Sequence, residues 1–242
     1  MQHASHNGPA PQRHTALTLS DGEVDFLWWF IQGSIMDADI RSRLYDHWGM
    51  CPRHALAFFV VEAAFRPHLV HGSTILYNAL MRNAVHLVGG HGPYRFAPEV
   101  LVRHKLCPTG PCHMCKLGYG PYSAGNAPPE RLAQGRDFTN ARMFAGENRT
   151  GWQPHVCGQC AAVDSPVLCR AHLVEAMQRE KPIPMQFHRS TVECISRHLA
   201  KFERAFRWDS RGTDTDEDRG ALIAAIGWCG GWREIVATFG IG

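Results

Sequence analysis

The chain has 242 residues, of which 45% are hydrophobic and 19% are charged. A chain of this length and composition can bury a real hydrophobic core, so a bound metal would not be the only thing that folds it. The formal net charge of +3 is too small to indicate nucleic-acid binding by itself. No uncharged apolar stretch approaches the roughly 18–20 residues of a membrane-spanning helix, which excludes that class of membrane protein.

Residues 1–18 are predicted to be a disordered tail, because they are rich in His, Pro, Gly and Gln. The tail lacks the apolar segment of a secretory signal, so we expect a cytoplasmic protein. The chain contains nine cysteines, most of them closely spaced with another cysteine or a histidine. In a reducing compartment this spacing favours metal binding over disulfides, and the odd number of cysteines points the same way.

The first part of the chain carries three helical patterns. A capping signal at Ser20–Glu23 and apolar residues at helical spacing predict a helix over 21–47, either continuous or broken. A second helix is predicted over 52–65, with Pro52 in the first turn, and a third over 70–88. The adjacent pair Trp28 and Trp29 is predicted to lie in the core.

The remainder alternates between loops and helices. Residues 89–128 are rich in Gly and Pro and are expected to be irregular, except near 99–104. Later helices are predicted over 129–145, 169–178 and 185–208, with a loop at 146–164, an acidic helix start at 214–218 leading into 222–226, and a short helix or strand at 232–239.

No alternating pattern is long enough to build a sheet. The fold class is therefore predicted to be all-α or nearly so, a multi-helix domain whose long Gly/Pro-rich loops are held by zinc. We expect an N-terminal helical unit over 19–92 and, over 93–242, metal-held loops with a C-terminal helical unit.

Four short pairs of cysteine and histidine carry the chemistry. Two intervening residues allow a tight turn to aim both side chains at one ion, and four such ligands complete a tetrahedral zinc site. Two of the pairs are C-x-x-H motifs that open a helix, where the free N–H groups stabilise a thiolate. The eight candidate ligands are Cys51, His54, Cys112, Cys115, Cys157, Cys160, Cys169 and His172. They match two Cys3His sites, so two zinc ions are expected.

The pairing of these motifs stays open at this point. Cys157/Cys160 and Cys169/His172 form a local unit that could close on itself, which leaves Cys112/Cys115 to join Cys51/His54. The other arrangement couples Cys112/Cys115 with Cys169/His172 and leaves Cys157/Cys160 for Cys51/His54. We favour the local closure because the shorter loop costs less entropy.

Two other groups of residues could also form a metal site. Cys107, Cys112 and Cys115 have the spacing of a plant-type iron–sulfur cluster, although the paired histidine motifs favour zinc and Cys107 is then a spare thiol. Cys194 and His198 stand four residues apart on a predicted helix and could touch one ion, but we expect Cys194 in the core and His198 at the surface.

The segment Trp48–His54 and the segment Gly72–Leu80 resemble a bacterial family of Cys/His-rich helical proteins of unknown function. Its members look like tandem units, each with a C-P-x-C motif and a later G-x-C-x-x-H motif. The resemblance implies that a second unit carries Cys112/Cys115 and Cys169/His172, although no cysteine near residues 15–25 supplies the first C-P-x-C. Cys157/Cys160 would then replace the lost ligands, which favours the second pairing. The family implies a helical fold and metal binding but no activity.

The sequence contains none of several common catalytic motifs. The chain has no G-x-S-x-G, H-E-x-x-H, P-loop or G-x-G-x-x-G motif. The function favoured is therefore an intracellular zinc protein with structural sites, acting as a protein-interaction or regulatory module. One alternative is a metalloenzyme of a small-molecule pathway with an open zinc site. A second is nucleic-acid binding through Arg95, Arg103, His104 and Lys105, with Arg149 before the later cluster, which is weaker because these charges are sparse.

Overall fold

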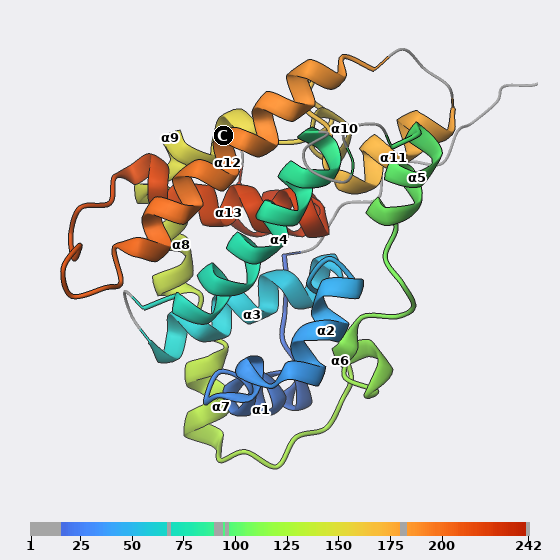
Figure 1. Cartoon of the computed structure of the whole chain (residues 1–242). Helices are drawn as coiled ribbons and strands as arrows, with labels where there is room; N and C mark the ends of the chain where they lie inside the picture. Colours follow the sequence, from blue (N-terminus) through green and yellow to red (C-terminus); the bar gives the residue numbers. More distant parts are fainter. Residues whose placement is uncertain (1–15, 67–68, 90–93, 95–96, 180–182, 241–242) are drawn as a thin grey trace, which may run out of the picture.

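The computed structural model describes residues 16–66, 69–89, 94, 97–179 and 183–240. Most of the predicted tail lies outside these residues. Throughout the described part of the chain every regular element of more than a single residue is a helix, which confirms the all-α fold class (Figure 1). None of the described helices is both long and apolar enough to cross a membrane.

The N-terminal helices begin at clear capping signals. In the capping box of α1, the Ser20 hydroxyl accepts from the Glu23 backbone N–H at 3.2 Å and Glu23 accepts from the Ser20 backbone N–H at 2.8 Å. The predicted helix over 21–47 is broken, because the first helix ends at Phe30 and the carboxylate of Asp37 caps a new helix that begins at Ala38. The elements up to residue 89 are α1 (Asp21–Phe30), η1 (Ser34–Met36), α2 (Ala38–Asp46), α3 (Pro52–Phe65) and α4 (His71–Gly89).

The second part of the chain is more finely divided than the sequence predicts. The helix predicted over 129–145 is two helices that are separated at residues 136–138, where the Asp137 carboxylate accepts a local hydrogen bond from the Thr139 N–H. The predicted loop over 146–164 contains three short helical pieces, and residues 232–239 contain a helix rather than a strand. The elements are α5 (Glu99–Leu106), α6 (His113–Lys116), α7 (Pro129–Gly135), α8 (Thr139–Glu147), α9 (Arg149–Trp152), η3 (Gln153–His155), α10 (Gly158–Ala161), α11 (Arg170–Gln178), α12 (Met185–Arg204), α13 (Asp216–Gly230) and α14 (Arg233–Phe239).

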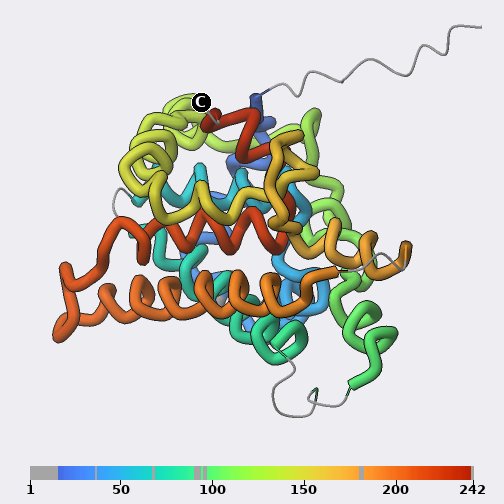
Figure 2. Tube along the Cα trace, turned by 90° about the horizontal axis from the view of Figure 1, so that it is seen from above, coloured from blue at the N-terminus to red at the C-terminus, as the bar shows by residue number. Residues whose placement is uncertain are grey.

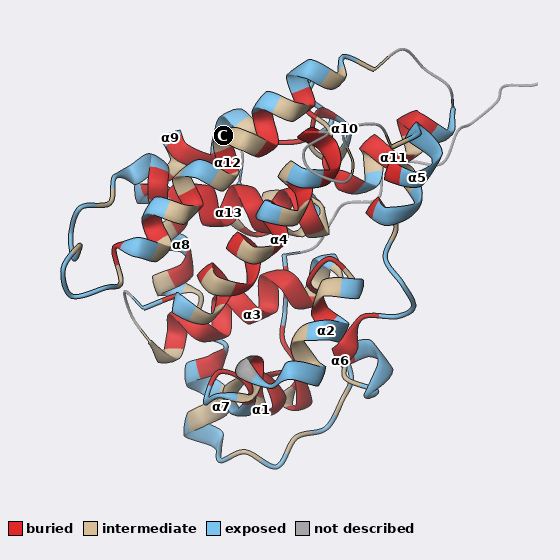
Figure 3. Cartoon of the chain, viewed as in Figure 1, coloured by how far each residue is buried: buried red, intermediate tan, exposed pale blue. Residues whose placement is uncertain are grey.

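Helices α3 and α13 form the centre of the molecule, and the other helices surround them (Figures 1 and 2). Both are buried around most of their circumference (Figure 3). Helix α12 is amphipathic, and its apolar face packs along α4 and α13. The backbones of α9 and α13 approach so closely that a Cβ atom on Gly220 would lie 2.6 Å from the Asn148 carbonyl oxygen. The proposed division into units over 19–92 and 93–242 stays a prediction.

The prediction for the tryptophan pair is wrong for Trp29, which is 51% exposed. Residues 28 and 29 follow each other on α1, so they face directions about 100° apart and cannot both meet α3. Trp28 is half-buried, and the Arg131 guanidinium lies over its ring at 3.8 Å from the centroid. Helix α1 instead buries its other face, through Val24, Leu27 and Phe30.

Candidate metal centres

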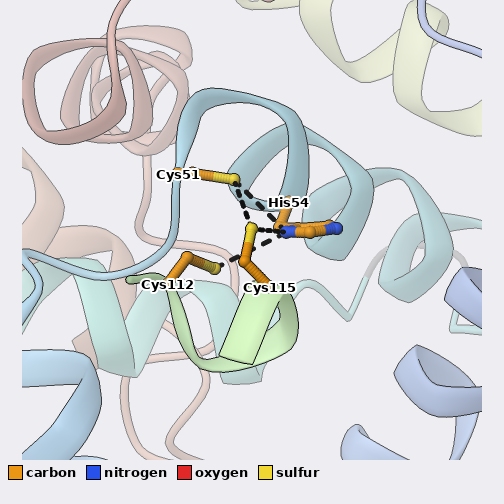
Figure 4. A group of neighbouring side chains, drawn as sticks. All are labelled: Cys51, His54, Cys112 and Cys115. Carbon is orange, nitrogen blue, oxygen red and sulfur yellow. Dashed lines mark hydrogen bonds between the residues drawn. The ribbon is translucent and has the colours of Figure 1, made fainter. Parts of the chain in front are cut away.

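The first candidate centre joins the start of α3 to the start of α6. Cys51, His54, Cys112 and Cys115 offer ligand atoms that all lie within 4.8 Å of one another. His54 Nδ1 lies 3.2 Å from the Cys51 sulfur, 3.5 Å from that of Cys112 and 3.4 Å from that of Cys115. The four side chains point toward a common centre (Figure 4).

The second candidate centre closes a loop between α10 and α11. Cys157, Cys160, Cys169 and His172 also offer ligand atoms within 4.8 Å of one another. His172 Nδ1 lies 3.2 Å from the Cys157 sulfur, 3.5 Å from that of Cys160 and 3.4 Å from that of Cys169. The two centres therefore repeat one another closely, with three thiols around the Nδ1 atom of one histidine.

The sulfur separations suit a tetrahedral ion. The Cys51 and Cys115 sulfurs are 3.8 Å apart, as are those of Cys160 and Cys169. A tetrahedron with metal–sulfur distances of about 2.3 Å has sulfur–sulfur edges of about 3.8 Å, whereas a disulfide needs about 2.05 Å. Each group is therefore spaced for an ion, and all nine cysteines are free thiols.

The structure groups the eight residues as the local closure predicts. Cys157/Cys160 meet Cys169/His172, and Cys51/His54 meet Cys112/Cys115. The pairing implied by the family resemblance, in which Cys112/Cys115 join Cys169/His172, is not found. The distant pairs of the first centre come together because α6 packs against α2, the helix that ends just before Cys51.

All four pairs stand at the start of a helix. Cys51, Cys112, Cys157 and Cys169 are the N-cap residues of α3, α6, α10 and α11, and the partner of each pair lies three residues later. First-turn N–H groups have no intrahelical partner, so they are free to face a sulfur. The sequence predicted this for the two C-x-x-H pairs but not for the C-x-x-C pairs, whose helices have only four residues each.

One thiol in each centre is strongly acidic. Hydrogen bonds to sulfur from Cys51 and His54, with help from the Cys115 backbone, outweigh burial and lower the pKa of Cys112 to about 3. Hydrogen bonds from Cys160 and Cys169 likewise lower the pKa of Cys157. The pKa of Cys51 and that of Cys169 are raised, because each donates its proton to the acidic sulfur. Each centre thus holds a thiolate ready for a metal, and binding would release the remaining thiol protons.

A buried carboxylate supports the histidine of the first centre. Glu23 is fully buried, and its Oε1 atom lies 3.2 Å from His54 Nε2, the ring nitrogen that faces away from the thiols. Arg53 donates to both Glu23 oxygens, at 2.6 Å and 2.7 Å. Burial alone would raise the pKa of Glu23, but hydrogen bonds from Arg53 and His54 outweigh it and hold the pKa at about 2.

A carboxylate behind a metal-ligating histidine fixes its tautomer and orientation. Glu23 can therefore hold a proton on His54 Nε2, so that Nδ1, the nitrogen that faces the three sulfurs, is the one that would give up its proton to bind a metal. From the sequence, Glu23 is only a helix-capping residue. Its second role depends on the packing of α1 against α3, which no local motif reveals.

The second centre is supported differently. The backbone N–H of Trp232 donates to the Cys160 sulfur at 3.5 Å, which ties the centre to the turn before α14. Cys157 and Cys169 are buried, whereas His172 is half-buried. In the first centre the exposed member is Cys115, and His54 is buried.

The other candidate ligands stay outside both groups. Among the described residues, Cys107 joins no cluster of three or more possible ligands, so the structure provides no iron–sulfur arrangement with Cys112 and Cys115. Cys194 is half-buried rather than in the core, and it shares a small cavity with His155 and His198. His198 is half-buried, and its Nδ1 lies within hydrogen-bonding distance of the Asp218 carboxylate, at 2.7 Å, so it is not a free surface residue.

No family model, curated protein or solved structure that was compared with the chain matches it. The resemblance to Cys/His-rich helical proteins therefore stays an expectation from the motifs. The function must be argued from the two centres themselves.

Proposed function

We propose that the chain binds two zinc ions, one in each Cys3His centre, and that both ions are structural. The observation that carries this proposal is the convergence of four protein donors on each of two points. A zinc ion with four protein ligands has no vacant position for water or substrate, which is typical of structural sites. A catalytic zinc keeps one position open, so this ligand count favours the structural role over the metalloenzyme alternative.

The donor atoms favour zinc over other ions. Three thiols and one imidazole suit a borderline-soft metal in tetrahedral geometry, and they do not suit magnesium or calcium, which prefer oxygen. An iron–sulfur cluster would need further cysteines where each centre presents a histidine. The free thiols also support an intracellular location, where a reducing environment keeps such residues available to metal.

The positions of the centres show what the ions would stabilise. The first centre connects α3, at the middle of the molecule, with the long segment between α5 and α7 that contains only the short helix α6. The second closes residues 157–172, which contain the four-residue helix α10 and the first residues of α11. Short helices and loops of this kind do not stay ordered on their own. Metal ligation supplies the missing constraint.

The broader role that we propose is a regulatory or protein-interaction module rather than an enzyme. It is supported by Trp29, which is 51% exposed on α1 and borders a shallow depression that also includes Ile40 and Asp37. Exposed tryptophan is enriched where proteins bind one another. No comparable observation on the described residues supports the nucleic-acid alternative.

Metal analysis of the purified full chain tests the proposal. We expect two zinc ions per chain by elemental analysis and native mass spectrometry. A strong chelator should remove them with a loss of helical circular dichroism, because structural zinc contributes roughly 10–16 kcal/mol in small zinc-finger peptides. The same chelator saturated with zinc is the control. A metal-free protein that keeps its full helical signal and thermal transition would refute the proposal.

A further inference from the structure

A pocket of about 410 Å³ lies beside the second centre and is partly open to solvent. Gly158 and Gln159, which stand between Cys157 and Cys160, form part of its wall. The wall also includes Ala176 of α11, Ile183, Pro184 and His188 of α12. A volume in this range is typical of sites for small molecules.

His188 is the unusual member of this wall. Its side chain is only 1% exposed, yet neither ring nitrogen has a hydrogen-bond partner among the described residues. A buried polar group without a partner costs free energy, so native proteins nearly always provide one. Because His188 lines the pocket, a molecule bound there can supply a partner to the ring nitrogen that it approaches.

The surroundings of His188 favour an uncharged partner. Burial lowers the pKa of His188, so the imidazole is neutral near pH 7. Asp164 is the only Asp, Glu, Lys or Arg among the described residues that line the pocket, and it is exposed. A buried ionic group on a ligand would have no counter-charge there and would lose its hydration.

A neutral imidazole donates from one nitrogen and accepts at the other. A hydroxyl group also donates and accepts, so it fits either tautomer of His188. The rest of the wall is largely apolar, through Leu168, Ala176, Ile183 and Pro184. We propose that this pocket binds a small uncharged molecule with an apolar body and a hydroxyl group that hydrogen-bonds to His188.

This site goes beyond the two metal centres but touches one of them. The turn that holds Gly158 packs tightly, because a Cβ atom there would lie 2.3 Å from the Ser165 carbonyl oxygen. Ser165 also lines the pocket. A ligand in the pocket would therefore rest on the same turn that presents Cys157 and Cys160 to the ion.

Three probes of similar size test the proposal on the zinc-loaded full chain. Phenol has the ring and the hydroxyl, benzene has the ring alone, and benzoate adds a charge. Nitrogen-15 NMR of the histidine rings follows each titration, with the His188→Phe variant used to assign the His188 signals. We expect phenol to shift both His188 ring nitrogens saturably and to bind at least about fivefold more tightly than benzene, since one hydrogen bond is at stake. Benzoate should bind more weakly than phenol.

Two variants sharpen the test. His188→Phe keeps an aromatic ring in place and should bind phenol no better than benzene. Ala176→Leu adds bulk to the wall and should abolish the phenol shifts. If His188→Phe fails to fold, the three-probe comparison on the native chain decides alone, with the ring signals assigned by sequential NMR.

The proposal is overturned if phenol and benzene bind the native chain equally, if benzoate binds more tightly than phenol, or if no His188 signal moves up to the solubility limit of phenol. Zinc content is measured on the same samples. A chain without zinc would contradict the proposed zinc sites. The probe titration is a separate measurement, and it tests only whether the pocket binds a ligand.

Discussion

The guanidinium of Arg170 lies over the indole ring of Trp48, 5.8 Å from its centroid. Arg170 follows the ligand Cys169 of the second centre, and Trp48 precedes the ligand Cys51 of the first by three residues. Arg170 donates to the Cys229 and Leu106 carbonyl oxygens, at 2.9 Å and 2.6 Å. The indole N–H of Trp48 donates to the Lys105 carbonyl oxygen at 3.0 Å. The segments that lead into both centres thus share one buried support, built on α5 and α13.

Replacing Arg170 with methionine should weaken this shared support. Two buried carbonyl oxygens would lose their donor, so we expect the free energy of unfolding to fall by about 2–4 kcal/mol. Urea denaturation of the zinc-loaded variant measures the change. Arg179→Met is the matched control, because Arg179 forms an exposed ion pair with Glu175 and its loss should cost less than about 1 kcal/mol. Equal losses in the two variants would contradict the shared support.

Much of the fold and both metal groups could be predicted from the sequence, because the deciding signals are local. Pro52 marks the start of α3, and each ligand pair is separated by two residues whatever the rest of the chain does. The grouping of the second centre also followed from loop entropy, since Cys157 and His172 are only 15 residues apart.

The parts that sequence could not predict depend on non-local contacts. Helices α9 and α10 have four residues each, too few to show a periodic pattern; α9 is placed by its packing against α13, and α10 begins right after the candidate ligand Cys157 and contains Cys160. Glu23 meets His54, which lies 31 residues further along the chain, only because α1 packs against α3. The exposure of Trp29 is decided by which face of α1 meets α3, and hydrophobicity alone gives both tryptophans the same prediction.

Neutralising Glu23 should weaken the first centre selectively. In Glu23→Gln the carboxylate behind His54 is lost, and we expect zinc affinity there to fall by about 10–100-fold. The second centre should be unaffected, because Glu23 acts through its contacts with Arg53 and His54, and His54 belongs to the first centre. The protein is loaded with cadmium in place of zinc and titrated with a chelator. Cadmium NMR gives each centre its own resonance, so the loss of metal from the first and from the second centre is measured separately.

Asp21→Asn is the control for Glu23→Gln. Asp21 lies in the same first turn of α1, but its carboxylate is exposed and pairs with Arg136. Its variant should retain the affinity of both centres within about twofold, since exposed ion pairs contribute little. A uniform loss at both centres in Glu23→Gln would point to general destabilisation instead of a role behind His54.

Exchanging single cysteines should distinguish ligands from spare thiols. Cys115→Ser removes a donor from the first centre, so we expect a markedly weakened first ion and a retained second one. Cys107→Ser alters a thiol that belongs to neither group and should leave two zinc ions per chain. Native mass spectrometry at limiting zinc counts the ions in both variants. Loss of a metal ion from Cys107→Ser, or visible absorption typical of iron–sulfur clusters in the native chain, would contradict this prediction. Either result would favour an iron–sulfur cluster bound by Cys107, Cys112 and Cys115.

The stability of the chain should depend on pH through His188. Its pKa in the folded state is lowered by burial, an effect that the negative charge of Cys157 opposes without cancelling it. As pH falls below about 6.5, the unfolded chain therefore takes up a proton that the folded chain does not. The native chain should lose stability relative to His188→Phe, approaching about 1.4 kcal/mol per pH unit once the unfolded histidine is fully protonated.

Urea denaturation of both proteins at about pH 7.5 and about pH 5.5 measures this difference, with excess zinc present and zinc content checked at each pH. Protonation of metal ligands destabilises both proteins alike, so the difference between them isolates His188. Asp164 lines the same pocket, and Asp164→Asn is the control that should keep the pH dependence of the native chain, because that carboxylate is exposed. Parallel stability curves for the native chain and His188→Phe would mean that His188 takes up its proton equally readily in the folded state, and the neutral imidazole required by the pocket would be lost.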